Sequence, residues 1–131
     1  MSIMATSVLL ASSGCSLGAD EEPQPASGAP AQIADTVDRL EGAVAQRDFA
    51  TICGRLFTAR ARERAGGDEC AAQLRSATEG VKRPSIEIEA IDVKAGRATV
   101  SVRTEAEGQA RVSDELQLRR EDGRWLVEAL S

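Results

Sequence analysis

The sequence predicts an α+β fold in which three N-terminal helices pack on a curved antiparallel sheet of about four strands. Apolar residues recur at helical spacing before Pro84, and apolar and polar residues alternate after it. Asp122-Gly123, between two alternating runs, is a strong signal for a two-residue hairpin turn. Consecutive helices followed by consecutive strands place the helices together on one side of the sheet.

The helical half divides into three expected helices. Residues 31–47 form the first, with an apolar face made by Ile33, Val37, Leu40 and Val44. Asp48 is the expected N-cap of the second, whose apolar stripe is Phe49, Ile52, Cys53 and Leu56. We expect Thr58 to restart that helix and Gly66-Gly67 to end it. Asp68 then caps a third helix, which carries Cys70, Leu74 and Val81.

The first expected strand, residues 85–93, changes its alternation midway. Ile86, Ile88 and Ala90 share one phase, whereas Ile91 and Val93 share the other. A change of phase within a strand indicates a β-bulge. The solvent face of the sheet is expected to carry acidic residues, namely Glu87, Glu89, Asp92, Glu105 and Glu107.

Three more strands complete the expected sheet. In residues 98–106, Val100 and Val102 share one face. Residues 110–121 place four side chains in phase, namely Val112, Asp114, Leu116 and Leu118. Pairing across the hairpin turn sets two pairs opposite each other, Leu118 with Val127 and Arg120 with Trp125. We therefore expect Trp125 to lie in the core or a pocket wall, with Arg120 stacked on it.

The first 30 residues differ from this domain. Residues 3–11 are apolar but far shorter than the roughly 20 residues that span a bilayer, and they match the apolar core of a signal peptide. The following Ser12-Ser13-Gly14-Cys15 resembles the lipobox of bacterial lipoproteins. This resemblance implies a signal peptide over residues 1–14 and a lipidated Cys15. The alternative is an N-terminal helix or strand with a buried thiol.

Residues 15–30 are expected to form a disordered linker. All but one of the chain's 4 prolines fall in this stretch, together with an acidic triplet and few apolar side chains. A flexible coil of this length reaches on the order of 20 Å, enough to hold a small domain clear of lipid headgroups. The folded domain is therefore expected to span residues 31–131.

The chain has 3 cysteines, an odd number that is awkward in an exported protein. If Cys15 carries lipid, Cys53 and Cys70 remain as a pair, which an oxidising exterior favours as a disulfide. Closing that loop would stabilise the domain by roughly 3 kcal/mol. Two buried reduced thiols are the alternative.

Composition excludes several classes of site. The net charge of -5 argues against a nucleic-acid binder, which should carry a basic face. With 0 His and 0 Tyr, the chain can form neither a Ser-His-Asp triad nor a Cys-His dyad nor an ordinary zinc site. The sequence also has no Gly-rich phosphate loop and no Asp-rich loop with calcium spacing. We expect no metal and no cofactor.

Three segments carry a family resemblance: RDFATICGRLFTARAR at 47–62, AGRATVSV at 95–102 and EDGRWLVEAL at 121–130. They resemble small actinobacterial lipoproteins with a nuclear transport factor 2-like (NTF2-like) domain, also called the ketosteroid isomerase-like cone. The resemblance covers roughly residues 33–129. It implies that the helices close over the curved sheet and leave a cone-shaped cavity. Enzymes, ligand binders and scaffolds all use this fold, so it does not deliver a function.

Asp114 is the side chain considered as a possible catalytic base. Strand alternation points its carboxylate toward the apolar side of the sheet, where burial would make it a stronger base. Enzymes of the fold need a Tyr, a His or a second acid beside such a base, and this chain has neither Tyr nor His. We therefore expect Asp114 to be solvated or paired with an Arg, and we assign no catalytic residue. The candidate pocket residues are Asp114, Trp125, Leu116, Leu118 and Val100. Four arginines are expected on solvated helix surface, with anionic headgroups as the alternative contact: Arg55, Arg60, Arg62 and Arg64.

These observations predict an exported bacterial protein, lipid-anchored on the extracytoplasmic face of the cell membrane. Its domain is expected to be a non-catalytic module that binds a small apolar ligand or a protein partner. One alternative is an accessory or sensory domain docked to a membrane protein. A third hypothesis is an isomerase- or dehydratase-type enzyme that uses Asp114. No nucleic-acid partner is expected.

Overall fold

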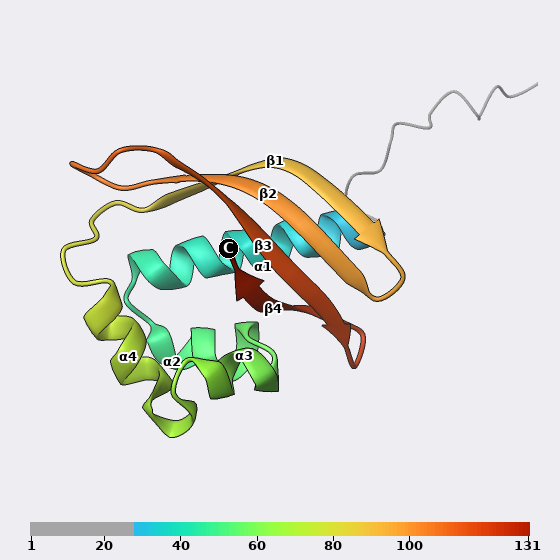
Figure 1. The fold of residues 1–131 in the computed structure, drawn as a ribbon, viewed down its shortest axis with the longest axis horizontal. Helices are drawn as coiled ribbons and strands as arrows, with labels where there is room; N and C mark the ends of the chain where they lie inside the picture. Colours follow the sequence, from blue (N-terminus) through green and yellow to red (C-terminus); the bar gives the residue numbers. More distant parts are fainter. Residues whose placement is uncertain (1–27) are drawn as a thin grey trace, which may run out of the picture.

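The computed structural model describes residues 28–131, so the expected signal peptide, Cys15 and most of the expected linker lie outside the described residues. Figure 1 shows helices followed by a curved sheet, as the sequence predicts. The helical elements are α1 (Ala29–Ala45), α2 (Phe49–Thr51), a π-helical turn η2 (Ile52–Leu56), α3 (Ala59–Arg64), a 3-10 turn η3 (Gly67–Glu69) and α4 (Cys70–Ala77). The strands are β1 (Ser85–Lys94), β2 (Arg97–Glu105), β3 (Val112–Glu121) and β4 (Arg124–Leu130).

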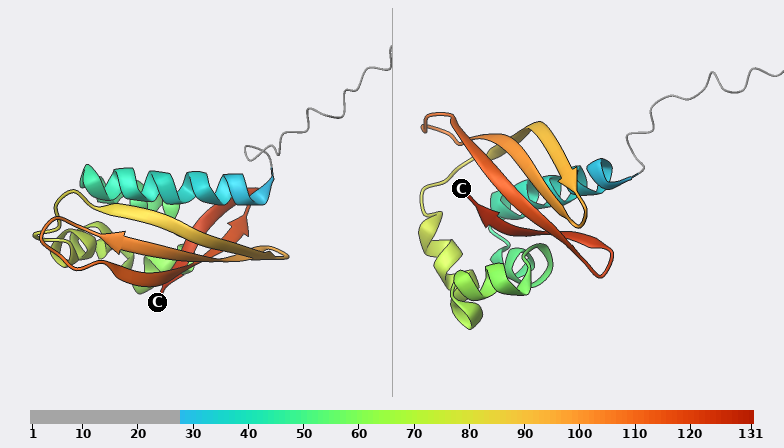
Figure 2. Two further views of the ribbon diagram at one scale, coloured as in Figure 1. Left: turned by 90° about the horizontal axis from the view of Figure 1, so that it is seen from above. Right: turned by 45° about the vertical axis from the view of Figure 1, so that its right-hand side comes forward.

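Helix α1 lies along one face of the sheet (Figure 2). It begins at Ala29, two residues before the expected start of the domain at residue 31, because Pro30 suits the first turn of a helix, where no backbone N–H is required. Ile33 and Val37 are fully buried against the sheet. The Thr36 hydroxyl donates a hydrogen bond to the Trp125 carbonyl at 2.8 Å, which fixes α1 to β4. Within residues 28–131, no helix combines the length and apolar character needed to cross a bilayer.

Both expected caps of the second helical segment are confirmed. The Asp48 carboxylate accepts hydrogen bonds from the Thr51 hydroxyl at 2.7 Å and the Thr51 backbone N–H at 3.2 Å. These bonds, the hydroxyl first, lower the pKa of Asp48. The Thr58 hydroxyl accepts from the Ala61 N–H at 3.0 Å and starts α3. The sequence did not predict the π-helical turn η2 between the two caps.

The expected third helix is wrong at both ends. Asp68 does not cap it, because residues 67–69 form the turn η3 and the Asp68 side chain is exposed, with its carboxylate 3.8 Å from the Arg62 guanidinium. The helix α4 ends at Ala77, where the Thr78 hydroxyl donates to the Leu74 carbonyl at 2.7 Å. Val81 therefore lies beyond α4 and not on its face.

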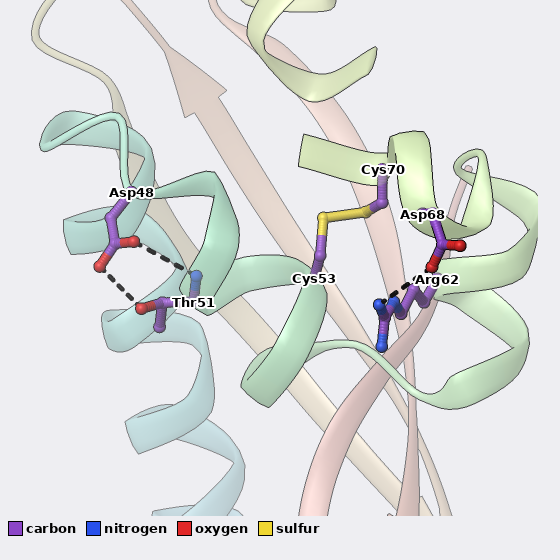
Figure 3. Close-up of a disulfide and its surroundings, with 6 residues drawn as sticks. All are labelled: Asp48, Thr51, Cys53, Arg62, Asp68 and Cys70. Carbon is purple, nitrogen blue, oxygen red and sulfur yellow. Dashed lines mark hydrogen bonds and ion pairs between the residues drawn. A yellow bond between two sulfur atoms is a disulfide. The ribbon is translucent and has the colours of Figure 1, made fainter. Parts of the chain in front are cut away.

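A disulfide joins Cys53 in η2 to Cys70 at the start of α4 (Figure 3). The two Cα atoms are 6.1 Å apart, and both side chains are buried. The bridge is the one expected from the cysteine count. It connects the middle of the helical half to its last helix, so the start of α4 stays beside η2 as long as the bridge is intact.

The sheet is antiparallel, with its strands in chain order. The expected bulge in β1 is confirmed as a shift of register between Ile88 and Ala90. Asp122 and Gly123 have φ angles of 50° and 77°, as a tight hairpin turn requires, and both expected pairs across the turn are present. The outer edge of β4 is covered by the helical half, because Phe57 pairs with Val127 and the Thr58 N–H donates to the Val127 carbonyl at 3.0 Å.

The main core lies between α1 and the inner face of the sheet. Its buried members are Ile33, Val37, Ala98, Val100, Val102, Leu116, Leu118, Trp125 and Val127. Two expectations fail here. Val112, at the far end of β3, is 49% exposed because no helix covers that end. Among the described residues, no guanidinium stacks on Trp125, and the cation–π contacts are those of Arg47 and Arg75 on Phe49.

Candidate functional site

An apolar cavity of about 500 Å³ lies between the helices and the inner face of the sheet. Its size falls within the range of small-molecule sites in proteins. Aliphatic and aromatic side chains from α1, α2, η2, α4 and all four strands line most of it, among them Leu40, Val44, Phe49, Ile52, Leu74, Ile86, Val102, Leu116 and Val127. The cavity therefore offers mainly dispersion contacts and shelter from water.

The cavity lies where two apolar clusters meet. The main core joins α1 to the sheet, and a second cluster joins α1 to the short helices through Ala43, Phe49, Ile52 and Leu56. Leu40 and Phe57 pack against both clusters. Because the sheet curves away from the short helices, these two clusters do not fill the space between them, and the cavity remains.

Glu128 supplies the charged part of the cavity wall together with Arg64. A shift of register in the β3–β4 pairing, between Gln117 and Leu118, leaves Glu128 outside the ladder and re-aims its side chain. Its carboxylate accepts a hydrogen bond from the Thr58 hydroxyl at 2.5 Å and lies 3.6 Å from the Arg64 guanidinium. The Glu128 side chain is only 16% exposed. Sequence reasoning missed this group, because Trp125, Leu126 and Val127 are consecutive apolar residues and β4 shows no change of phase that would indicate a bulge.

The other polar side chains in the wall already have partners within the chain. The Thr78 hydroxyl donates to the Leu74 carbonyl, and the Thr104 hydroxyl donates to the Asp114 carboxylate at 3.2 Å. Arg64 also donates to the backbone carbonyl of Glu128 at 2.5 Å. The groups that could recognise a polar ligand are thus engaged in holding α3, α4 and β3 in place.

The structure separates the five expected pocket residues. Four of them, Val100, Leu116, Leu118 and Trp125, share the main core, but only Leu116 lines the cavity. Asp114 is half-buried and touches the cavity only through Thr104. Trp125 instead borders a separate, larger groove of about 910 Å³ beside α1. In residues 28–131, no group of three potential metal ligands occurs.

Apart from Glu107, the surface arginines and acids lie as the sequence predicts, with two additions. Glu87, Glu89, Asp92 and Glu105 are exposed on the sheet, whereas Glu107 is exposed but lies in the turn between β2 and β3. Arg55, Arg60, Arg62 and Arg64 are exposed as well. Two of these arginines make ion pairs, Arg62 with Asp68 and Arg64 with Glu128, which the sequence did not indicate.

No protein-family model matches the sequence, and no curated protein resembles it significantly. Several solved structures are similar. An NTF2-like protein of unknown function from Silicibacter pomeroyi has 19% identity and a TM-score of 0.59, over 76% of this chain and 90% of that one. An NTF2-like protein of unknown function from Shewanella baltica has 15% identity and a TM-score of 0.55, over 76% and 91%. A putative NTF2-like transpeptidase from Campylobacter jejuni has 17% identity and a TM-score of 0.56, over 74% and 97%.

These similarities concern the fold, since identities this low carry no information on activity. They agree with the element order and the curved four-stranded antiparallel sheet. The described part of the chain therefore has the NTF2-like fold that the three sequence segments resemble.

Proposed function

We propose that this chain is an exported, lipid-anchored surface protein whose NTF2-like domain is a non-catalytic module that binds a small apolar ligand. The observation that carries the binding role is the apolar cavity between helices and sheet. A ligand that buries about 200 Å² of apolar surface there would gain about 5 kcal/mol from leaving water. The polar groups of the wall are bonded to one another, so a ligand that needs many hydrogen bonds would find few available partners.

The neutral fluorophore N-phenyl-1-naphthylamine tests this role, because its emission rises in apolar surroundings. The full chain carrying Cys15→Ser, which has no site for acylation, should bind it saturably. Val44 lines the cavity from α1, so Val44→Phe should fill part of it and weaken binding at least tenfold. The matched control is Ala45→Phe, on the next and exposed residue of the same helix, which should bind as before. Equal binding by the two Phe variants would refute the cavity as the ligand site.

The anchoring role rests on Cys15 and the residues before it, which lie outside the described part of the chain. If Cys15 carries a diacylglyceryl group, the protein should partition with membranes and resist extraction with high salt, since two acyl chains anchor stably. Cys15→Ser should release it or leave it unprocessed. Retention of a processed Cys15→Ser chain on membranes would contradict the proposal.

Docking to a protein partner is the second candidate. Leu130, at the end of β4, is 63% exposed and belongs to the cavity wall, so an apolar partner segment could cover it. Crosslinking from a photoreactive residue at position 130, in cells, distinguishes the two: a single protein adduct favours docking. An enzyme that acts through Asp114 has less support, because Asp114 does not line the cavity.

A further inference from the structure

Two arginines face each other across neighbouring strands. Arg97, at the start of β2, is the direct partner of Arg119 on β3. Their inward-facing neighbours Ala98 and Leu118 are buried, so alternation directs both guanidinium groups to the opposite, outer face of the sheet. Like charges in directly opposed positions destabilise a sheet. An anion bound between the two guanidinium groups would relieve this repulsion.

Helix α3 brings further arginines to the same place. Arg60 and Arg64 line, with Arg97 and Arg119, a hollow of about 410 Å³ on this outer face, which we call the arginine hollow. Thr99 and Gln117, the next pair along β2 and β3 on this face, add a hydroxyl and an amide to its wall. The hollow thus combines four guanidinium groups with two neutral donors.

The chain supplies little negative charge to the hollow. Its one acidic residue is Glu128, whose carboxylate is already engaged by Thr58 and Arg64. Within residues 28–131, Arg60, Arg97 and Arg119 make neither an ion pair nor a side-chain hydrogen bond. Several other arginines of the domain pair with nearby carboxylates, namely Arg39, Arg62, Arg83, Arg103 and Arg111. Arg55, Arg120 and Arg124 also lack a carboxylate partner among the described residues, so what distinguishes the hollow is that three unpaired arginines lie together in it.

We propose that the arginine hollow is an anion site that binds a phosphate-bearing group. Guanidinium forks match the tetrahedral oxygens of a phosphate and can each donate two hydrogen bonds to it. The hollow is larger than a single phosphate needs, so it also has room for the organic part of a phosphate ester. The same chemistry is offered by a soluble organic phosphate and by the headgroup of an anionic phospholipid.

The test uses the full chain with Cys15→Ser, so that no acyl group can hold it to lipid. Inorganic phosphate and glycerol 3-phosphate are titrated calorimetrically at constant ionic strength, and binding to phosphatidylglycerol vesicles is compared with binding to phosphatidylcholine vesicles. Arg97→Gln/Arg119→Gln should weaken binding at least tenfold. Arg120→Gln is the control, because Arg120 is also exposed but, as the residue after Arg119, lies on the other face of β3.

Each result decides the proposal. Saturable binding of glycerol 3-phosphate that the double variant loses and Arg120→Gln keeps supports a soluble ligand. Binding to phosphatidylglycerol vesicles alone, with the same dependence on Arg97 and Arg119, supports a lipid headgroup. The proposal is overturned if neither probe binds, or if Arg120→Gln weakens binding as much as the double variant. Thermal unfolding without phosphate at low ionic strength should show the double variant to be at least as stable as the parent, which separates lost binding from lost folding.

Discussion

Reduction of the Cys53–Cys70 disulfide should lower the stability of the domain by an amount set by the chain that it encloses. The sequence separation is 17 residues, for which the loop-entropy relation gives about 3 kcal/mol at 25 °C. This is a large share of the roughly 5–15 kcal/mol that keeps a domain of this size folded. With a urea m-value of about 1.5 kcal/mol per M, the unfolding midpoint should fall by about 2 M.

The assay is urea unfolding followed by the fluorescence of Trp125, which is buried in the core and is the only Trp. The protein is measured oxidised and after reduction with a phosphine. Cys53→Ala/Cys70→Ala is the control, because reductant should leave its midpoint unchanged. If the oxidised and reduced forms of the parent unfold within about 0.3 M of each other, the bridge does not constrain the unfolded chain as this reasoning requires.

Three further changes test the caps and the hairpin. Thr58→Val removes the cap of α3 and the hydrogen bond to Glu128. The free energy of unfolding, measured by urea titration, should therefore fall by about 2 kcal/mol. A loss below about 0.5 kcal/mol would contradict a stabilising role for these two contacts. The lowered pKa of Asp48 means that its ionised form stabilises the fold above the unfolded-state pKa near 3.8, and this contribution is lost as the pH falls through the lower folded-state value. Asp48→Asn should therefore unfold at lower urea than the parent at pH 6, and the gap should close toward pH 3; a gap independent of pH would count against the assignment. Gly123→Ala should lower the free energy of unfolding by about 1 kcal/mol, because Gly123 has a φ of 77°. Gly96→Ala is its control and should be close to neutral, because a Cβ at position 96 would meet no atom closer than 4.0 Å. Equal losses of stability for the two variants in thermal melts would show that the turn does not need glycine.

Local chemistry was sufficient to predict much of this fold. Asp48 and Thr58 act as caps through bonds to residues three positions away, and the β1 bulge shows as a change of phase within one strand. The Asp122-Gly123 turn fixes its own register, so the pairs across it could be derived by counting. In each case the determining contacts lie within a few residues of one another.

The candidate site depended on contacts that local patterns do not encode. Glu128 reaches Thr58 across 70 positions of sequence, and only because β4 bulges there. Alternation grouped the five expected pocket residues by strand face, but most of that face is filled by α1, and the cavity lies beyond it under the short helices. Asp68 has the residue type of a cap, yet it does not cap α4, which starts only at Cys70 after the turn η3.

The arginine hollow also combines a local feature of the sequence with contacts between residues far apart in the chain. The sequence displays a local run of basic residues on α3, but the strand partners Arg97 and Arg119 join it only when the sheet is paired and α3 is placed beside it. That Arg97 lies opposite Arg119 is known only once the register between β2 and β3 is known. The hollow therefore could not have been predicted before the strands were paired.

The intact mass of the protein extracted from cell membranes with mild detergent tests the account most directly, measured first under native conditions and then after denaturation. The account predicts a denatured mass for a chain that starts at Cys15, carries a diacylglyceryl group and lacks two hydrogens because of the Cys53–Cys70 bridge. The native mass should be larger by one small apolar molecule. An unmodified chain of 131 residues with free thiols, recovered from the soluble fraction, would contradict it.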